Sequence, residues 1–140
     1  MPARWRGLPP LDRALLAEAA VTLALASALI RLAPFRKIAG LAGRKPLSGD
    51  AQGTIGELAP RVRWAVEAAA RRLPWRILCF QQGLAAHLML RRRGHPSTLS
   101  YGVGRREGWR LAAHVWVRAG GLDVVGCDIA DEFATVASFP

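Results

Sequence analysis

A cysteine and a histidine in two separate stretches of the chain could together form a nucleophilic site. Cys79 stands near the start of RILCFQQGLAAHLMLRRRG, residues 76–94, and His114 stands within LAAHVWVRAGG, residues 111–121. A thiol becomes a strong nucleophile when an imidazole takes its proton, so this pair is typical of covalent acyl chemistry. Because most buried cysteines serve packing alone, the elements around Cys79 decide between the two interpretations.

Cys79 is expected on the first turn of a helix. The apolar spacing predicts a helix that starts near Leu78 and ends at Gly94, and the charges of Arg91 to Arg93 suit the negative end of its dipole. A thiol at the start of this helix faces unpaired backbone amides and the positive end of the dipole, which stabilise the thiolate. The same amides would form part of an oxyanion site.

His114 is expected in the middle of a strand. Alternation places His114, Trp116 and Arg118 on one face and the intervening residues on the other. A lone strand histidine is usually structural, but an imidazole brought beside Cys79 would hold the thiol proton and serve as general base.

Two aspartates could orient the imidazole. If residues 119–122 form a tight turn, the return strand brings residues 126–128 back beside His114, so Asp128 is the better candidate. Asp123 follows the turn closely and is expected opposite Arg118 as a cross-strand ion pair. The choice between the two aspartates depends on the hairpin register.

The remaining cysteine and histidines are expected to be structural or exposed. Cys127 is interpreted as strand packing, His87 as packing or solvent contact in mid-helix, and His95 as an exposed turn residue before Pro96. Scattered histidines without paired cysteines do not predict a zinc site. Neither nucleotide-binding glycine motif occurs in the right context, so no cofactor is expected.

The elements that would carry these residues follow an α+β order, with helices first and an antiparallel sheet after them. Helices are predicted for residues 12–33, 60–73 and 78–94, and a Gly- and Pro-rich loop for residues 37–60. Short β-branched or aromatic runs predict an antiparallel meander of four strands at residues 97–103, 109–119, 122–127 and 133–139. We expect an N-terminal helical segment, residues 1–45, and a core, residues 46–140, within one compact domain.

Composition limits the possible partners and compartment. The 140 residues are 51% hydrophobic, enough for one domain with a real core. Lys and Arg outnumber Asp and Glu by 20 to 10, which gives a net charge of +10 and favours anionic partners. The basic residues are scattered rather than interleaved with aromatics, which disfavours nucleic acid. Two distant cysteines indicate a reducing compartment.

The N-terminal segment has to be weighed as a membrane span. Its uncharged run, residues 19–30, is shorter than the roughly 20 residues that a bilayer crossing needs, and Glu18 and Arg31 bracket it. No convincing cleavage site follows. We therefore expect a buried or partner-docking helix in a cytoplasmic protein.

Three stretches together resemble a known family. LCFQQGLAAHLMLRRRGHPSTLSYGV, LAAHVWVRAGG and the terminal FATVASFP are similar to the leader peptidase of lasso peptide biosynthesis, a transglutaminase-like cysteine protease. The order of a helix-terminal cysteine, a strand histidine and an acid on the next strand is also that of papain-like and transglutaminase-like enzymes. The resemblance covers residues 75–140 well and residues 1–45 with lower specificity.

The resemblance implies a function, roles for three residues and partners. It implies removal of the leader from the precursor peptide, with Cys79 as nucleophile, His114 as base and Asp128 as acid, although VVGCD departs from the family near the acid. It also implies the split form, in which a separate protein recognises the leader, and the lasso cyclase as a further partner. A non-catalytic peptide-binding subunit and a transglutaminase-type acyl transferase are the alternatives.

Overall fold

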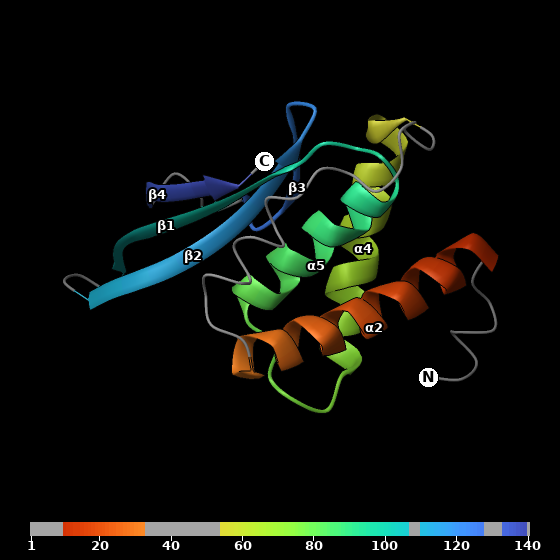
Figure 1. Cartoon of the computed structure of the whole chain (residues 1–140), viewed down its shortest axis with the longest axis horizontal. Helices are drawn as coiled ribbons and strands as arrows, with labels where there is room; N and C mark the ends of the chain where they lie inside the picture. The colour runs from red at the N-terminus through yellow and green to blue at the C-terminus, as the bar shows by residue number, and fades with distance from the viewer. Residues whose placement is uncertain (1–9, 33–53, 107–109, 128–132, 140) are drawn as a thin grey trace.

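Three helices precede a four-stranded sheet in the computed structural model, which describes residues 10–32, 54–106, 110–127 and 133–139. The helices are α2 (Pro10–Leu32), α4 (Ile55–Arg72) and α5 (Cys79–Arg92), and the strands are β1 (Thr98–Arg106), β2 (Arg110–Ala119), β3 (Leu122–Val125) and β4 (Ala134–Phe139). Helices α4 and α5 pack on the sheet, and α2 crosses both of them on their far side (Figure 1). The predicted α+β order is confirmed.

The order of the strands differs from the predicted meander. The sheet is antiparallel with the order β3-β2-β1-β4, so β4 pairs with β1 instead of β3. Gly126, at φ 71°, follows the end of β3, and Phe133 packs against Trp116 of β2. Phe133 packs on the face of β2 that points away from the helices. The chain that follows it therefore enters β4 next to β1 and not next to β3. The residue pattern within each strand does not indicate which strand will be its neighbour in the sheet.

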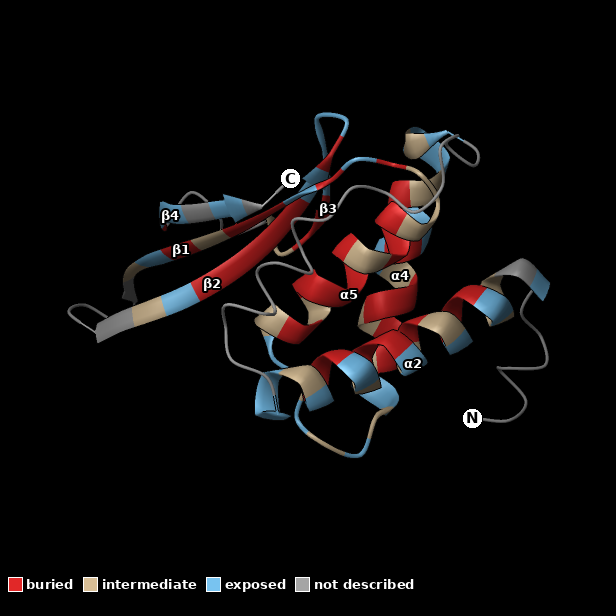
Figure 2. Cartoon of the chain, in the orientation of Figure 1, coloured by how far each residue is buried: buried red, intermediate tan, exposed pale blue. Residues whose placement is uncertain are grey.

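Helix α2 contributes one face to the core that the other elements share. Figure 2 shows the buried faces of α2, α4 and α5 turned toward one another. The buried apolar residues of α2 are Leu15, Leu16, Ala19, Leu23 and Ala26. They belong to the same cluster as the buried residues of α4, α5 and the sheet, so α2 is an integral part of the fold.

The opposite face of α2 is apolar and exposed. Val21 is 61% exposed, Leu25 53% and Leu32 85%. By length and composition alone, residues 12–32 could cross a membrane. The prediction had considered only the uncharged run of residues 19–30, which is too short for a crossing. One helix carries both a core face and an exposed apolar face.

Helix α4 begins five residues earlier than predicted, so that Pro60, which was expected to start the helix, lies inside it. The sequence predicted a start at Pro60, whereas the helix begins at Ile55 and the part of the predicted loop in residues 37–53 lies outside the described residues. The backbone carbonyl of Thr54 accepts from Glu57 and Leu58, which holds the first turn. Ile55 and Leu58 also pack against the core, and this packing keeps the turn helical despite the missing N–H of Pro60.

The end of α5 is as predicted, but the histidine after it is not exposed. Gly94 has φ 78°, and the amides of Gly94 and His95 bond the carbonyls of Arg91 and Leu90 at 3.0 Å. These two bonds make a Schellman motif. The motif turns the chain back toward the core, which leaves His95 only 6% exposed and corrects the expectation of an exposed turn.

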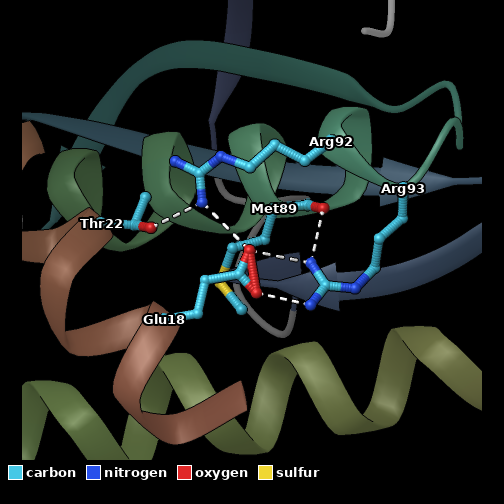
Figure 3. A network of polar contacts seen from close by, with 5 residues as sticks. All are labelled: Glu18, Thr22, Met89, Arg92 and Arg93. Atoms are coloured by element: carbon cyan, nitrogen blue, oxygen red, sulfur yellow. Dashed lines mark hydrogen bonds and ion pairs between the residues drawn. The ribbon is translucent and has the colours of Figure 1, made fainter. Parts of the chain in front are cut away.

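A carboxylate on α2 joins that helix to the end of α5 (Figure 3). Glu18 accepts hydrogen bonds from Arg92 at 3.1 Å and from Arg93 at 3.0 Å, and Arg92 also donates to Thr22 at 2.9 Å. Burial alone would raise the pKa of Glu18, but the hydrogen bonds and charges of Arg93 and Arg92 outweigh it and hold this pKa below its ordinary value. The ion pairs therefore favour the folded protein when Glu18 is charged.

Replacing Glu18 by glutamine should destabilise the protein in a pH-dependent way. At pH 7 we expect a loss of about 1–3 kcal/mol in the free energy of unfolding, because two partly buried guanidinium groups lose their counter-charge. The folded-state pKa of Glu18 is below its ordinary value of 4.5, so this contribution is present above that pH and lost as pH falls through the folded-state pKa.

Urea denaturation of the wild type and of Glu18→Gln at pH 7 and pH 3 measures the difference in their free energies of unfolding. Glu67→Gln is the control, because its ion pair with Arg63 is exposed and should matter little. A gap between wild type and Glu18→Gln that stays constant from pH 7 to pH 3 would contradict the linkage.

Candidate active site

Cys79 is the first residue of α5, and the start of that helix is tied to α2. Gln81 accepts from the backbone N–H of Leu78 at 2.6 Å and donates to the hydroxyl of Ser27 at 2.8 Å. Ser27 also accepts from the indole of Trp75 at 3.0 Å. The predicted place of Cys79 on the first turn is confirmed, and buried polar contacts fix that turn in the fold.

Cys79 and His114 line the same pocket, which has a volume of about 270 Å³. The other residues that line the pocket are Glu67, Gln82, Val115, Val125 and Gly126. Cys79 is half-buried, and His114 is 8% exposed. The structure therefore brings together two residues that are 35 positions apart in the sequence.

The imidazole of His114 is held on three sides. Its ring stacks on Trp116 at a centroid distance of 6.0 Å and on Phe133 at 5.1 Å. Its Nε2 lies 2.7 Å from the backbone carbonyl oxygen of Gly126. Because a carbonyl oxygen can only accept, Nε2 carries the proton in this bond, and Nδ1 of the neutral ring is left with the lone pair of a base.

The two faces of β2 are as the alternation predicted. His114 and Trp116 stack with Phe133, whereas Val115 and Val117 belong to the core beneath the helices. This alternation lets one strand contribute both to the core and to the site.

The hairpin register favoured Asp128 over Asp123 as the acid that could orient the imidazole. Asp123 pairs with Arg118, whose Nε donates to its carboxylate at 2.9 Å, and this hydrogen bond lowers the pKa of Asp123. The predicted cross-strand partner of Arg118 is confirmed. Gly126 lies beside His114, as the register predicted for the start of this stretch, but Asp128 lies outside the described residues.

The other cysteine and His87 are in structural surroundings. The Cys127 thiol donates to the carbonyl of Val117 at 3.2 Å, and burial raises its pKa. His87 is fully buried, with Nδ1 2.6 Å from the hydroxyl of Ser97. Neither residue lines the pocket with Cys79. Among the described residues, no group of three or more His, Cys, Asp or Glu could hold a metal ion.

The sequence did not identify five residues of the pocket as site residues: the apolar Val115 and Val125, and Gly126, Glu67 and Gln82. Gly126 acts through its backbone, which any residue type possesses, although a glycine after a strand does signal a positive φ. Glu67 comes from α4, whose placement depends on tertiary packing. Gln82 had a usable signal, because it lies one helical turn after Cys79 and therefore on the same side of α5.

The pocket has the parts that covalent acyl chemistry needs. Cys79, at a helix N-terminus, and His114, whose imidazole has a defined tautomer, both line it. An acyl carbonyl in this space would meet the sulfur of Cys79, while Nδ1 of His114 could accept and return a proton.

A family model described as the transglutaminase-like superfamily matches residues 19–138. The match begins within α2 and ends within β4, so it includes Cys79, His114 and the whole pocket between them. No curated protein and no solved structure matches the chain.

Adding a methyl group at residue 126 should disturb the imidazole of His114. A Cβ on Gly126 would lie 2.5 Å from the carbonyl oxygen of Val115 and 3.2 Å from Nε2 of His114. Gly121→Ala is a matched control, because Gly121 also has a positive φ, 78°, but its Cβ would meet no atom within 4 Å. Both variants carry the backbone strain of a positive φ, but only Gly126→Ala adds the steric conflict.

We expect Gly126→Ala to be less stable than Gly121→Ala by at least about 1 kcal/mol in urea denaturation. In ¹⁵N spectra of the imidazole, the wild type and Gly121→Ala should show the Nε2–H tautomer of His114, and Gly126→Ala should lose its hydrogen-bonded signal. An Nδ1–H tautomer in the wild type would contradict the assignment.

Proposed function

Because the chain belongs to the transglutaminase-like superfamily, we propose that it is a cysteine peptidase that removes the leader peptide from a lasso peptide precursor. This superfamily includes both cysteine peptidases and acyl transferases. The observation that carries the proposal is the shared pocket of Cys79 and His114, in which the imidazole is held by the Gly126 carbonyl. The family resemblance of the Cys79 helix, the His114 strand and the terminal strand supports the choice of a leader peptidase.

The proposed reaction uses the thiol of Cys79 and the imidazole of His114, two residues that line the pocket. His114 Nδ1 takes the proton of Cys79, and the thiolate adds to the scissile carbonyl at the junction of leader and core. The imidazolium then gives its proton to the leaving amine, and a thioester remains on Cys79. His114 activates the water that hydrolyses the thioester, which frees the leader and restores the thiol.

A separate leader-recognition protein fits the exposed face of α2. Val21, Leu25 and Leu32 expose apolar surface there, and Arg31 adds positive charge at the end of the helix. Such a surface suits an anionic, partly apolar partner or leader in the cytoplasm. The lasso cyclase is the further partner that the resemblance implies.

Two alternatives share part of the evidence. An acyl transferase would use the same Cys79 and His114 and pass the acyl group to an amine instead of water. A non-catalytic peptide-binding subunit would use the pocket without a reactive thiol. Product masses distinguish the first alternative, and thiol reactivity distinguishes the second.

The leader peptidase should cut the precursor encoded in its own gene neighbourhood, and Cys79→Ala should abolish the cleavage. The variant should keep its fold, because the half-buried thiol at the helix start contributes little packing. Mass spectrometry of the products, with and without the recognition protein and at low and high salt, measures the reaction. The recognition protein should raise the rate, and salt should reduce the gain.

Alkylation by iodoacetamide provides the control that needs no substrate. Cys79 should react faster than Cys127 at neutral pH, because burial raises the pKa of the Cys127 thiol and leaves less thiolate. Cleavage by Cys79→Ala at a rate comparable to wild type would end the peptidase proposal. Equal, slow alkylation of both thiols would favour the non-catalytic subunit.

Asp128→Ala should reduce cleavage more than Asp123→Ala does. Asp123 is exposed and paired with Arg118, so its loss should leave the imidazole in place. A carboxylate near His114 would stabilise the imidazolium by its charge, and its removal should lower kcat by at least about tenfold. Comparing kcat of the two variants on the precursor tests the assignment, and the reverse order would show that Asp128 is not the third residue.

A further inference from the structure

Gln82 lines the pocket beside Cys79. Gln82 follows Cys79 by one turn on α5, and both residues line the pocket that contains His114. Helical side chains lean toward the N-terminus of their helix, so the Gln82 amide covers the turn on which Cys79 stands. Its position therefore suits a contact with a group bound at the sulfur.

The Gln82 amide has no hydrogen-bond partner among the described residues, although the pocket buries part of its side chain. The neighbouring Gln81 differs, because its carbonyl oxygen accepts from Leu78 and its Nε2 donates to Ser27. The two adjacent glutamines therefore differ: Gln81 holds the start of the helix by two hydrogen bonds, whereas the Gln82 amide is available to bind a group in the pocket.

Backbone donors lie at the same end of the helix. At the start of α5, the backbone amide of Gln82 donates a hydrogen bond to the carbonyl of Leu78, the residue before the helix. The amide of Cys79 precedes this bond, and amides of a first turn have no carbonyl to bond within their helix. A carbonyl oxygen bound at the Cys79 sulfur would therefore lie near a backbone donor and a side-chain donor together.

We propose that Gln82 is a catalytic residue whose Nε2–H donates to the oxyanion formed when Cys79 attacks an acyl carbonyl. This inference rests on the proposed function. The sulfur forms a bond to the carbonyl carbon, and the π electron pair of the C=O bond moves onto oxygen. Gln82 and the Cys79 amide bind that oxyanion until the C=O bond re-forms and the leaving group departs with its electron pair.

Two reagents separate this role from a structural one. p-Nitrophenyl acetate acylates Cys79 through a tetrahedral oxyanion and releases p-nitrophenolate, whereas iodoacetamide alkylates the sulfur by displacement of iodide at a saturated carbon without an oxyanion. Gln82→Met retains the length and packing of the side chain but removes the donor. Leu88→Met is the matched control, because Leu88 is a partly buried residue of α5 outside the pocket.

We expect Gln82→Met to slow the burst of p-nitrophenolate by about tenfold to hundredfold, and to leave the rate of alkylation unchanged. Leu88→Met should change neither rate. An equal fall in both rates would show that Gln82 acts on the thiolate or the fold, and no fall in acylation would also overturn the role. If wild-type Cys79 is alkylated no faster than Cys127, the proposed function fails first and the inference fails with it.

Discussion

Helix α5 can approach strand β2 closely because residue 83 has no side chain. A Cβ on Gly83 would lie only 2.5 Å from Cγ1 of Val115 and 3.2 Å from a methyl carbon of Leu99. Gly83 is one turn after Cys79, and Val115 is next to His114. Glycine inside a helix costs about 1 kcal/mol relative to alanine, and the contact that it permits fixes how closely the start of α5 approaches the His114 strand.

The same close packing explains why the site draws on so many elements. The thiol comes from α5, the imidazole from β2 and the carbonyl that fixes its tautomer from Gly126, after β3. All of these elements pack into the core that α2 also shares. The Glu18 ion pairs and the Ser27 hydrogen bonds hold α2 against opposite ends of α5. The position of Cys79 therefore depends on contacts far from the pocket.

Local signals predicted most of the elements and the two residues that share the pocket, but non-local packing decided the rest. The helix start at Cys79, the helix end at Gly94 and the partner of Arg118 depend on neighbouring residues or on a short hairpin, and all three follow from the sequence. The pairing of β4 with β1 depends on where Phe133 packs, and the burial of His95 on where a Schellman motif directs the chain. No local pattern encodes a backbone carbonyl as the partner of an imidazole.

Charge is distributed so that the pocket and the basic surface are separate. The chain has a net charge of +10, yet the only formally charged side chain among the described residues of the pocket is the carboxylate of Glu67. Arg92 and Arg93 are engaged by Glu18, on the side of α5 that faces α2. An anionic segment of a substrate would therefore gain little at the pocket itself and must be attracted by arginines elsewhere on the surface. This separation fits the proposed leader peptidase, for which a distant leader rather than the cleavage junction would identify the substrate.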